Sequence, residues 1–215
     1  MGKLQGLGDL MVFGVKLQFY FLYRVLLGGI IFGLFPGFLF VYRVVNSCFE
    51  EKMITHLDLK SELNRLTKTE VMKVNLCGYL LLFFLWILGI NLQVISIFIG
   101  SPALRFLTFG LLILTLNTGL YLLPILAKYE LPIKQYFLQS FLLGVISIID
   151  TIAILLGASL AFAISLIPPI GFFVGIPFIF IPYVWFSRAS IRRLEAVLYQ
   201  GQDYIGETSS KKEDQ

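Results

Sequence analysis

The chain has 215 residues, of which 58% are hydrophobic and 14% are charged, and its mean hydropathy is +0.86. A soluble domain is about 45–50% apolar and about 25% charged, so this composition is typical of a polytopic membrane protein. The net charge of +4 is small, and the basic residues flank apolar blocks. Membrane topology explains these residues better than nucleic-acid binding does, and no nucleic-acid partner is expected.

Five apolar blocks are long enough for membrane-spanning helices, which need about 20 mainly apolar residues. The blocks cover residues 19–42, 74–99, 104–127, 136–167 and 170–186. The expected fold is an all-α polytopic transmembrane helix bundle that forms one integral membrane domain over residues 1–199. A disordered, cytosolic tail is expected over residues 200–215. Pro177 and Pro182 in the short fifth block predict an irregular helix packed against others.

The first block contains the stretch GGIIFGLFPGFLFVYR, with glycines and a proline inside an apolar run. In one interpretation a single helix spans the block and is kinked at Gly33 and Pro36. In the other, residues 12–31 cross the membrane, the chain turns, and a half-helix begins at Pro36. That return leg has only about 10 Å of helix before Arg43. Both interpretations predict a hinge at the same residues, Gly33, Pro36 and Gly37.

The segment 43–73 is the largest polar element between two blocks, and it is rich in basic residues. Because basic loops remain in the cytosol, this loop, the 128–135 connection and the C-terminus are expected on the cytosolic side. With five full spans, the N-terminus is then outside the cell. With a span plus a half-helix, it is inside.

The loop also has the pattern of an amphipathic helix that leads into the second span. Four leucines approximate a helical stripe, namely Leu57, Leu59, Leu63 and Leu66. Thr67 and Glu70 fit a capping box before the next helix. One interpretation is a solvated or interfacial helix, and the other is a docking surface for a partner.

Asp150 is an acid inside the fourth apolar block, within LLGVISIIDTIAILLGASLAFAI. A charge at the bilayer centre costs about 2.5–3.5 kcal/mol on insertion scales, so this side chain should face protein or water. The candidate partners are Asn117, at similar depth in the third block, and Arg24. One interpretation is a structural acid held by Asn117 and Thr151. The other is a step in a proton or solute pathway.

The sequence contains no set of residues typical of an enzyme or a metal site. His56 is the only histidine, and Cys48 and Cys77 are the only cysteines, without the spacing of a structural zinc site. The nucleophile-elbow, P-loop and dinucleotide-binding motifs are absent. No catalytic residue, cofactor or metal ligand is therefore assigned.

Several stretches together resemble the YesL family of bacterial membrane proteins, also called the DUF624 family. These are GLFPGFLFVYRVV, LKSELNRLTKTEVMKVNLCGYLLL, LYLLPILAKYELPIKQYFLQSFLL and GIPFIFIPYVWFSRASIRRLE, in this order across residues 5–195. Tyr121, Pro124, Tyr129 and Lys134 fit the family's pattern of span, proline, short basic loop and new helix. The chain departs from the family in its bulky GLFPGFLF stretch, where members commonly carry small residues.

The resemblance implies an integral bacterial membrane protein of unassigned molecular function, whose relatives are often encoded beside genes for carbohydrate uptake. It therefore implies an accessory or interaction protein of the cell membrane near sugar ABC importers, with permease subunits as partners. The expected working surfaces are the 50–73 loop and a basic helix over residues 188–199. The alternative is a small-solute or proton-coupled carrier with Asp150 and Asn117 in its path.

Overall fold

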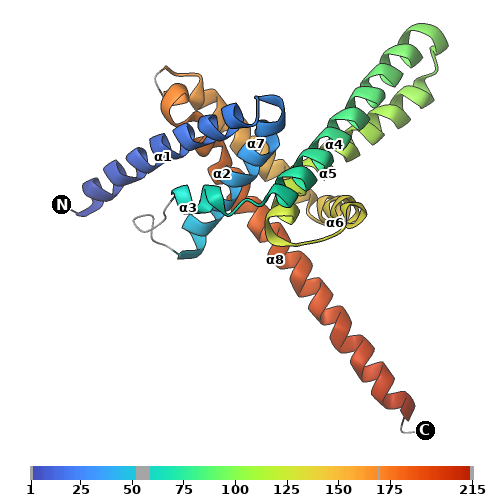
Figure 1. Ribbon diagram of the computed structural model, residues 1–215. Coiled ribbons are helices and arrows are strands. Elements are labelled where there is room, and N and C mark those ends of the chain that lie inside the picture. The colour runs from blue at the N-terminus through green and yellow to red at the C-terminus, as the bar shows by residue number, and fades with distance from the viewer. Residues whose placement is uncertain (1, 52–58, 169, 214–215) are drawn as a thin grey trace.

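The computed structural model describes residues 2–51, 59–168 and 170–213, and all secondary structure in these ranges is helical (Figure 1). The elements are α1 (Gly2–Leu27), α2 (Ile31–Glu51), α3 (Leu59–Asn64), α4 (Lys68–Val94), the π-helix η1 (Ile95–Ile99), α5 (Pro102–Lys128), α6 (Ile133–Ile146), α7 (Ile148–Ser165) and α8 (Ile170–Glu213). Five segments are long and apolar enough to cross a membrane: Ile31–Glu50, Lys68–Ile99, Pro102–Lys128, Ile148–Ser165 and Gly171–Ala196. The prediction of an all-α multi-pass bundle with about five spans is confirmed.

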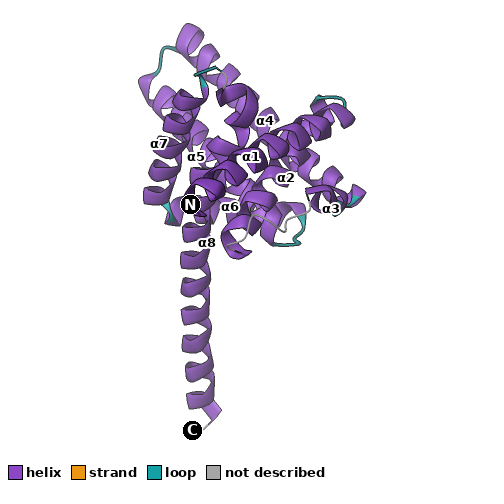
Figure 2. Cartoon of the chain, turned by 90° about the vertical axis from the view of Figure 1, so that its left-hand side faces the viewer, coloured by secondary structure: helices purple, strands orange, loops and turns teal. Residues whose placement is uncertain are grey.

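The buried core lies where α1, α2, α5 and α8 meet. Its largest fully buried side chains include Leu17, Phe40, Tyr121 and Val184, one from each of these helices. The α4–α5 hairpin extends away from this core (Figure 1), and the C-terminal part of α8 extends beyond it (Figure 2). The hairpin closes at Gly100, whose φ of 67° is readily adopted only by glycine.

The first apolar block forms two helices, and the chain reverses between them at Gly29 and Ile30. These residues have φ angles of 66° and 60°, a left-handed conformation that ends α1 and redirects the backbone. The residues of the predicted hinge, Gly33, Pro36 and Gly37, do not form this turn, because they lie inside the helix α2. Gly33 and Gly37 instead let α2 approach α1 closely, because a Cβ on either would come within 3 Å of atoms of α1.

Pro36 is tolerated inside α2 because another helix satisfies the carbonyl that it leaves unpaired. A proline has no N–H, so the carbonyl four residues earlier, on Phe32, loses its helical partner. The Asn75 side-chain amide of α4 donates to the Phe32 carbonyl oxygen at 2.9 Å. The proline therefore creates an acceptor that binds α4 to α2.

Pro124 in α5 has the same arrangement. It frees the Leu120 carbonyl, and the Tyr183 hydroxyl of α8 donates to this oxygen. Because unsatisfied backbone groups are costly in lipid, each proline makes one interhelical hydrogen bond favourable. The two bonds connect α2 with α4 and α5 with α8.

The fourth predicted span, 136–167, is not one helix. It breaks at Ser147 into α6 and α7, which run in different directions (Figure 1). Ser147 has φ −109° and ψ 42°, outside the helical region. Its carbonyl accepts from the Tyr121 hydroxyl at 3.2 Å, and Thr151 Oγ1 lies 3.1 Å from the same oxygen. These contacts hold α6 against α5 and start α7 along α8.

The last helix is longer than predicted. The fifth span extends over Gly171–Ala196 rather than 170–186, with Pro177 and Pro182 inside α8. The helix also includes residues 200–213, where the sequence predicts a disordered tail. Its added length brings the polar residues 187–195 beside α2, α5 and α7, which positions the site described below.

The loop after α2 is partly helical, and its predicted capping box is confirmed. Thr67 Oγ1 accepts from the Glu70 backbone N–H at 3.3 Å, and the Glu70 carboxylate accepts from the Thr67 N–H at 3.0 Å. Leu59, Leu63 and Leu66 are buried. Residues 52–58, with Leu57 and His56, lie outside the described residues.

The close approach of α2 to α1 gives a test with a matched control. A Cβ on Gly33 would collide with the backbone carbonyl of Val25, whereas a Cβ on Gly89 in α4 meets nothing within 4 Å. Gly33→Ala should destabilise the protein by about 1–3 kcal/mol through overpacking. Gly89→Ala should be neutral or stabilising by up to about 1 kcal/mol. Unfolding midpoints in detergent compare the two variants, and equal midpoints would contradict the α1–α2 packing.

Candidate functional site

Asp150 is buried and binds two residues of α8. Its Oδ2 accepts from the Ser190 hydroxyl at 2.8 Å and from Arg193 Nη1 at 3.1 Å. Its side chain is 6% exposed, whereas that of Arg193 is 60% exposed. Arg193 therefore supplies the positive charge that compensates the buried carboxylate, and its side chain reaches the surface of the bundle.

Three further polar side chains continue this contact toward α5. The Tyr121 hydroxyl lies 3.5 Å from Ser190 Oγ and 3.1 Å from Thr151 Oγ1. The Thr151 hydroxyl donates to Asn117 Oδ1 at 3.0 Å. We call this set the Asp150 cluster: Asp150, Ser190, Arg193, Tyr121, Thr151 and Asn117. It links α5, α7 and α8.

The predicted partners of Asp150 are placed differently by the structure. Asn117 belongs to the cluster, but it reaches the acid only through the hydroxyl chain that begins at Thr151. Arg24 lies in the last turn of α1, and no hydrogen bond or ion pair joins its side chain to the cluster in the described residues. Arg193 is the cation that pairs with Asp150 instead.

A second group of contacts joins α2 to α8 one turn away. The Tyr42 and Ser187 hydroxyls are 3.1 Å apart. Arg188 donates to the Asn46 carbonyl at 3.0 Å, and its other terminal nitrogen lies 3.7 Å from Glu50. These contacts fix the orientation of α8 against α2.

Charged residues gather where α2 and α5 end and α4 begins, next to residues 188–195 of α8. Arg43 pairs with Glu70 at 2.9 Å, and Lys128 pairs with Glu195 at 2.6 Å. The Tyr129 hydroxyl also donates to Glu195, at 2.6 Å. We call this region, with Arg43, Glu70, Lys128, Arg188 and Glu195, the charged end of the bundle. Its ion pairs link α2 to α4 and α5 to α8.

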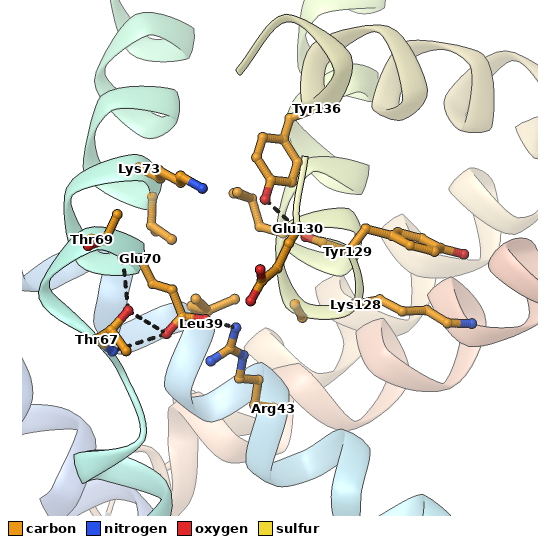
Figure 3. Close-up of a pocket in the computed structure, with 13 residues that line it drawn as sticks. Leu39, Arg43, Thr67, Thr69, Glu70, Lys73, Lys128, Tyr129, Glu130 and Tyr136 are labelled. Atoms are coloured by element: carbon orange, nitrogen blue, oxygen red, sulfur yellow. Dashed lines mark hydrogen bonds and ion pairs between the residues drawn. The ribbon is translucent and has the colours of Figure 1, made fainter. Parts of the chain in front are cut away.

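Two cavities open at the charged end. The first has a volume of about 280 Å³ and lies between α2, the start of α4 and the 129–136 connection (Figure 3). The second has a volume of about 440 Å³ and lies between α2, α5 and α8, with Glu62 of α3 at its edge. Arg43 and Lys128 line both cavities, so their ion pairs form the partition between them.

Among the described residues, no group of three or more His, Cys, Asp or Glu side chains could hold a metal ion. Cys77 is a buried thiol. The charged end offers guanidinium, ammonium and carboxylate groups around open volume, which suits polar or charged ligands.

Sequence reasoning missed Ser190, Arg193 and Tyr121 as members of the cluster. A signal existed in the polar residues of SRASIRR, where Ser187, Ser190 and Arg193 recur every three residues on one helical face. It went unused because the fifth span was expected to end at residue 186. The basic 188–199 helix was predicted only as a surface for partners.

Comparisons with known proteins find no matching family model, no matching curated protein and no matching solved structure. Membership of the YesL family therefore stays a prediction that rests on the order of the sequence stretches quoted above.

The Asp150 cluster gives a second test with a matched control. Tyr121→Phe removes a buried hydroxyl that contacts Ser147, Thr151 and Ser190, so it should destabilise the protein by about 1–3 kcal/mol. Tyr23→Phe changes a side chain that is 53% exposed and should change stability by less than about 0.5 kcal/mol. Chemical unfolding in mixed micelles measures both. If Tyr121→Phe were as stable as Tyr23→Phe, the contacts of the Tyr121 hydroxyl would not contribute to stability.

Proposed function

We propose that this chain is a multi-pass membrane accessory protein that binds a partner protein at its charged end. The observation that carries the proposal is the second cavity, which is open, large and mixed in charge. Four cations line it, Arg43, Lys128, Arg188 and Arg192, together with three acids, Glu50, Glu62 and Glu195. Charged side chains around a cavity suit recognition of a polar protein segment and give specificity through charge complementarity.

The form of the Asp150 cluster favours this function over transport. Its hydroxyl chain passes from Asp150 through Ser190, Tyr121 and Thr151, and it ends at the Asn117 amide. An amide does not titrate, and a proton pathway requires groups that exchange protons in series. The cluster is best explained as a set of contacts that holds three helices together. The charged end is then the surface that remains for binding.

The proposed partner is a permease subunit of a sugar ABC importer in the bacterial cell membrane. This part of the proposal is supported by the resemblance to the YesL family and by the basic character of the charged end. Under the positive-inside rule, the charged end faces the cytosol. The second cavity would then receive a cytosolic segment of the permease.

Photo-crosslinking in native membranes tests the partner. A photoreactive amino acid at Asn46, which lines the second cavity, should give a stoichiometric adduct with an importer permease subunit. The same amino acid at Ile97, which is 74% exposed on η1, should not. Arg192→Glu should reduce the adduct, and the exposed control Lys16→Glu should leave it unchanged. Equal adducts from Asn46 and Ile97, or none from Asn46, would contradict the proposal.

The carrier is the second candidate, because Asp150 is a buried acid joined to a chain of hydroxyls. Purified protein in liposomes distinguishes the two functions. An accessory protein should give no proton or sugar flux above empty liposomes. Flux by the protein alone that is lost in Asp150→Asn, with the fold intact by circular dichroism, would favour the carrier.

A further inference from the structure

The first cavity combines an apolar floor with a charged rim. Leu39, Val74 and Leu126 form the floor and are all buried. The wall on one side is the 129–132 connection, which Tyr136 holds in place: its hydroxyl donates to the Tyr129 carbonyl at 2.9 Å and accepts from the Leu131 N–H at 3.0 Å. The cavity therefore has a fixed wall on this side.

Two opposite charges in this cavity have no partner. Lys128 pairs with Glu195 and Arg43 pairs with Glu70, whereas no hydrogen bond or ion pair engages Lys73 or Glu130 in the described part of the chain. Figure 3 shows Lys73 extending from α4 and Glu130 extending from the connection after α5, both into the space above Arg43.

We propose that the first cavity binds a zwitterion in which a short linker joins an ammonium group to a phosphate. Lys73 and the N–H groups of Arg43 that do not bind Glu70 would hold the phosphate, and Glu130 would hold the ammonium. Arginine presents five N–H donors, and only one Arg43 contact, to Glu70, occurs in the described residues. The site shares Arg43 with the second cavity, whereas Lys73 and Glu130 line the first cavity and not the second.

The balance of charge selects this chemical class. A simple anion would be attracted by Lys73 and Arg43 but repelled by Glu70 and Glu130. A simple cation would be attracted by the two acids and repelled by the two bases. Lys73 comes from α4 and Glu130 from the connection after α5. Their charges sum to zero, so a neutral ligand that carries one charge of each sign satisfies both side chains. The same chemistry occurs in free phosphoethanolamine and in the headgroup of an ethanolamine phospholipid.

Titration in nanodiscs tests the site and identifies the source. Protein in phosphatidylcholine nanodiscs is titrated with phosphoethanolamine by calorimetry, and its thermal midpoint is compared in nanodiscs with and without phosphatidylethanolamine. Binding of phosphoethanolamine identifies a soluble ligand, and a raised midpoint with phosphatidylethanolamine alone identifies the lipid. Either response should weaken about tenfold in Lys73→Gln and in Glu130→Gln, because each loses one charge-assisted contact.

Control variants distinguish binding in the first cavity from a general effect of charge. Lys134→Gln removes a positive charge that does not line the first cavity and should leave the response unchanged. Lys73→Arg and Glu130→Asp keep the charges and should retain most of the binding. Absence of both responses would overturn the proposal. So would a response that is unaffected by Lys73→Gln and Glu130→Gln, or one that inorganic phosphate reproduces at equal concentration.

Discussion

A polar group inside a lipid-embedded bundle needs a partner within the protein, because the hydrocarbon supplies none. This constraint explains how the helices of the chain are joined. Pro36 and Pro124 each free a carbonyl, and Asn75 and Tyr183 from other helices donate to the two oxygens. Asp150 obeys the same rule through two donors from α8. In lipid, apolar packing alone discriminates weakly between possible helix neighbours, so these few hydrogen bonds determine which helices lie side by side.

The same bonds determine where unpaired charge remains. The acid within the apolar block binds two donors of α8, and its hydroxyl chain stops at an amide. Open volume and unpaired charge coincide only in the two cavities at the charged end, among the cavities described. Binding at that end therefore accounts for more of the polar groups than passage through the bundle does. The long α8 helix matters here because its residues 187–195 close one side of the second cavity.

The sequence predicted those features that depend on local physics. Span length and composition give the class and the number of spans, and the Thr67–Glu70 capping box depends on residues three apart. A turn before Pro36 was one of the two interpretations, but its position at Gly29 and Ile30 was missed, because a positive φ is not expected at isoleucine from the residue type. The partner of Asp150 was missed because it lies 43 residues away, on a helical segment that apolar length alone did not predict.

A double-mutant cycle on Tyr183 and Pro124 tests most directly whether polar groups freed by prolines join the helices. Tyr183→Phe removes the hydroxyl that donates to the Leu120 carbonyl, and Pro124→Ala restores a backbone N–H that can bond this oxygen instead. The free energy of unfolding of the four proteins is measured in the same mixed micelles. Tyr183→Phe should cost about 1–3 kcal/mol in the native sequence and clearly less beside Pro124→Ala, with a coupling of about 0.5–3 kcal/mol. Additive costs would contradict the account.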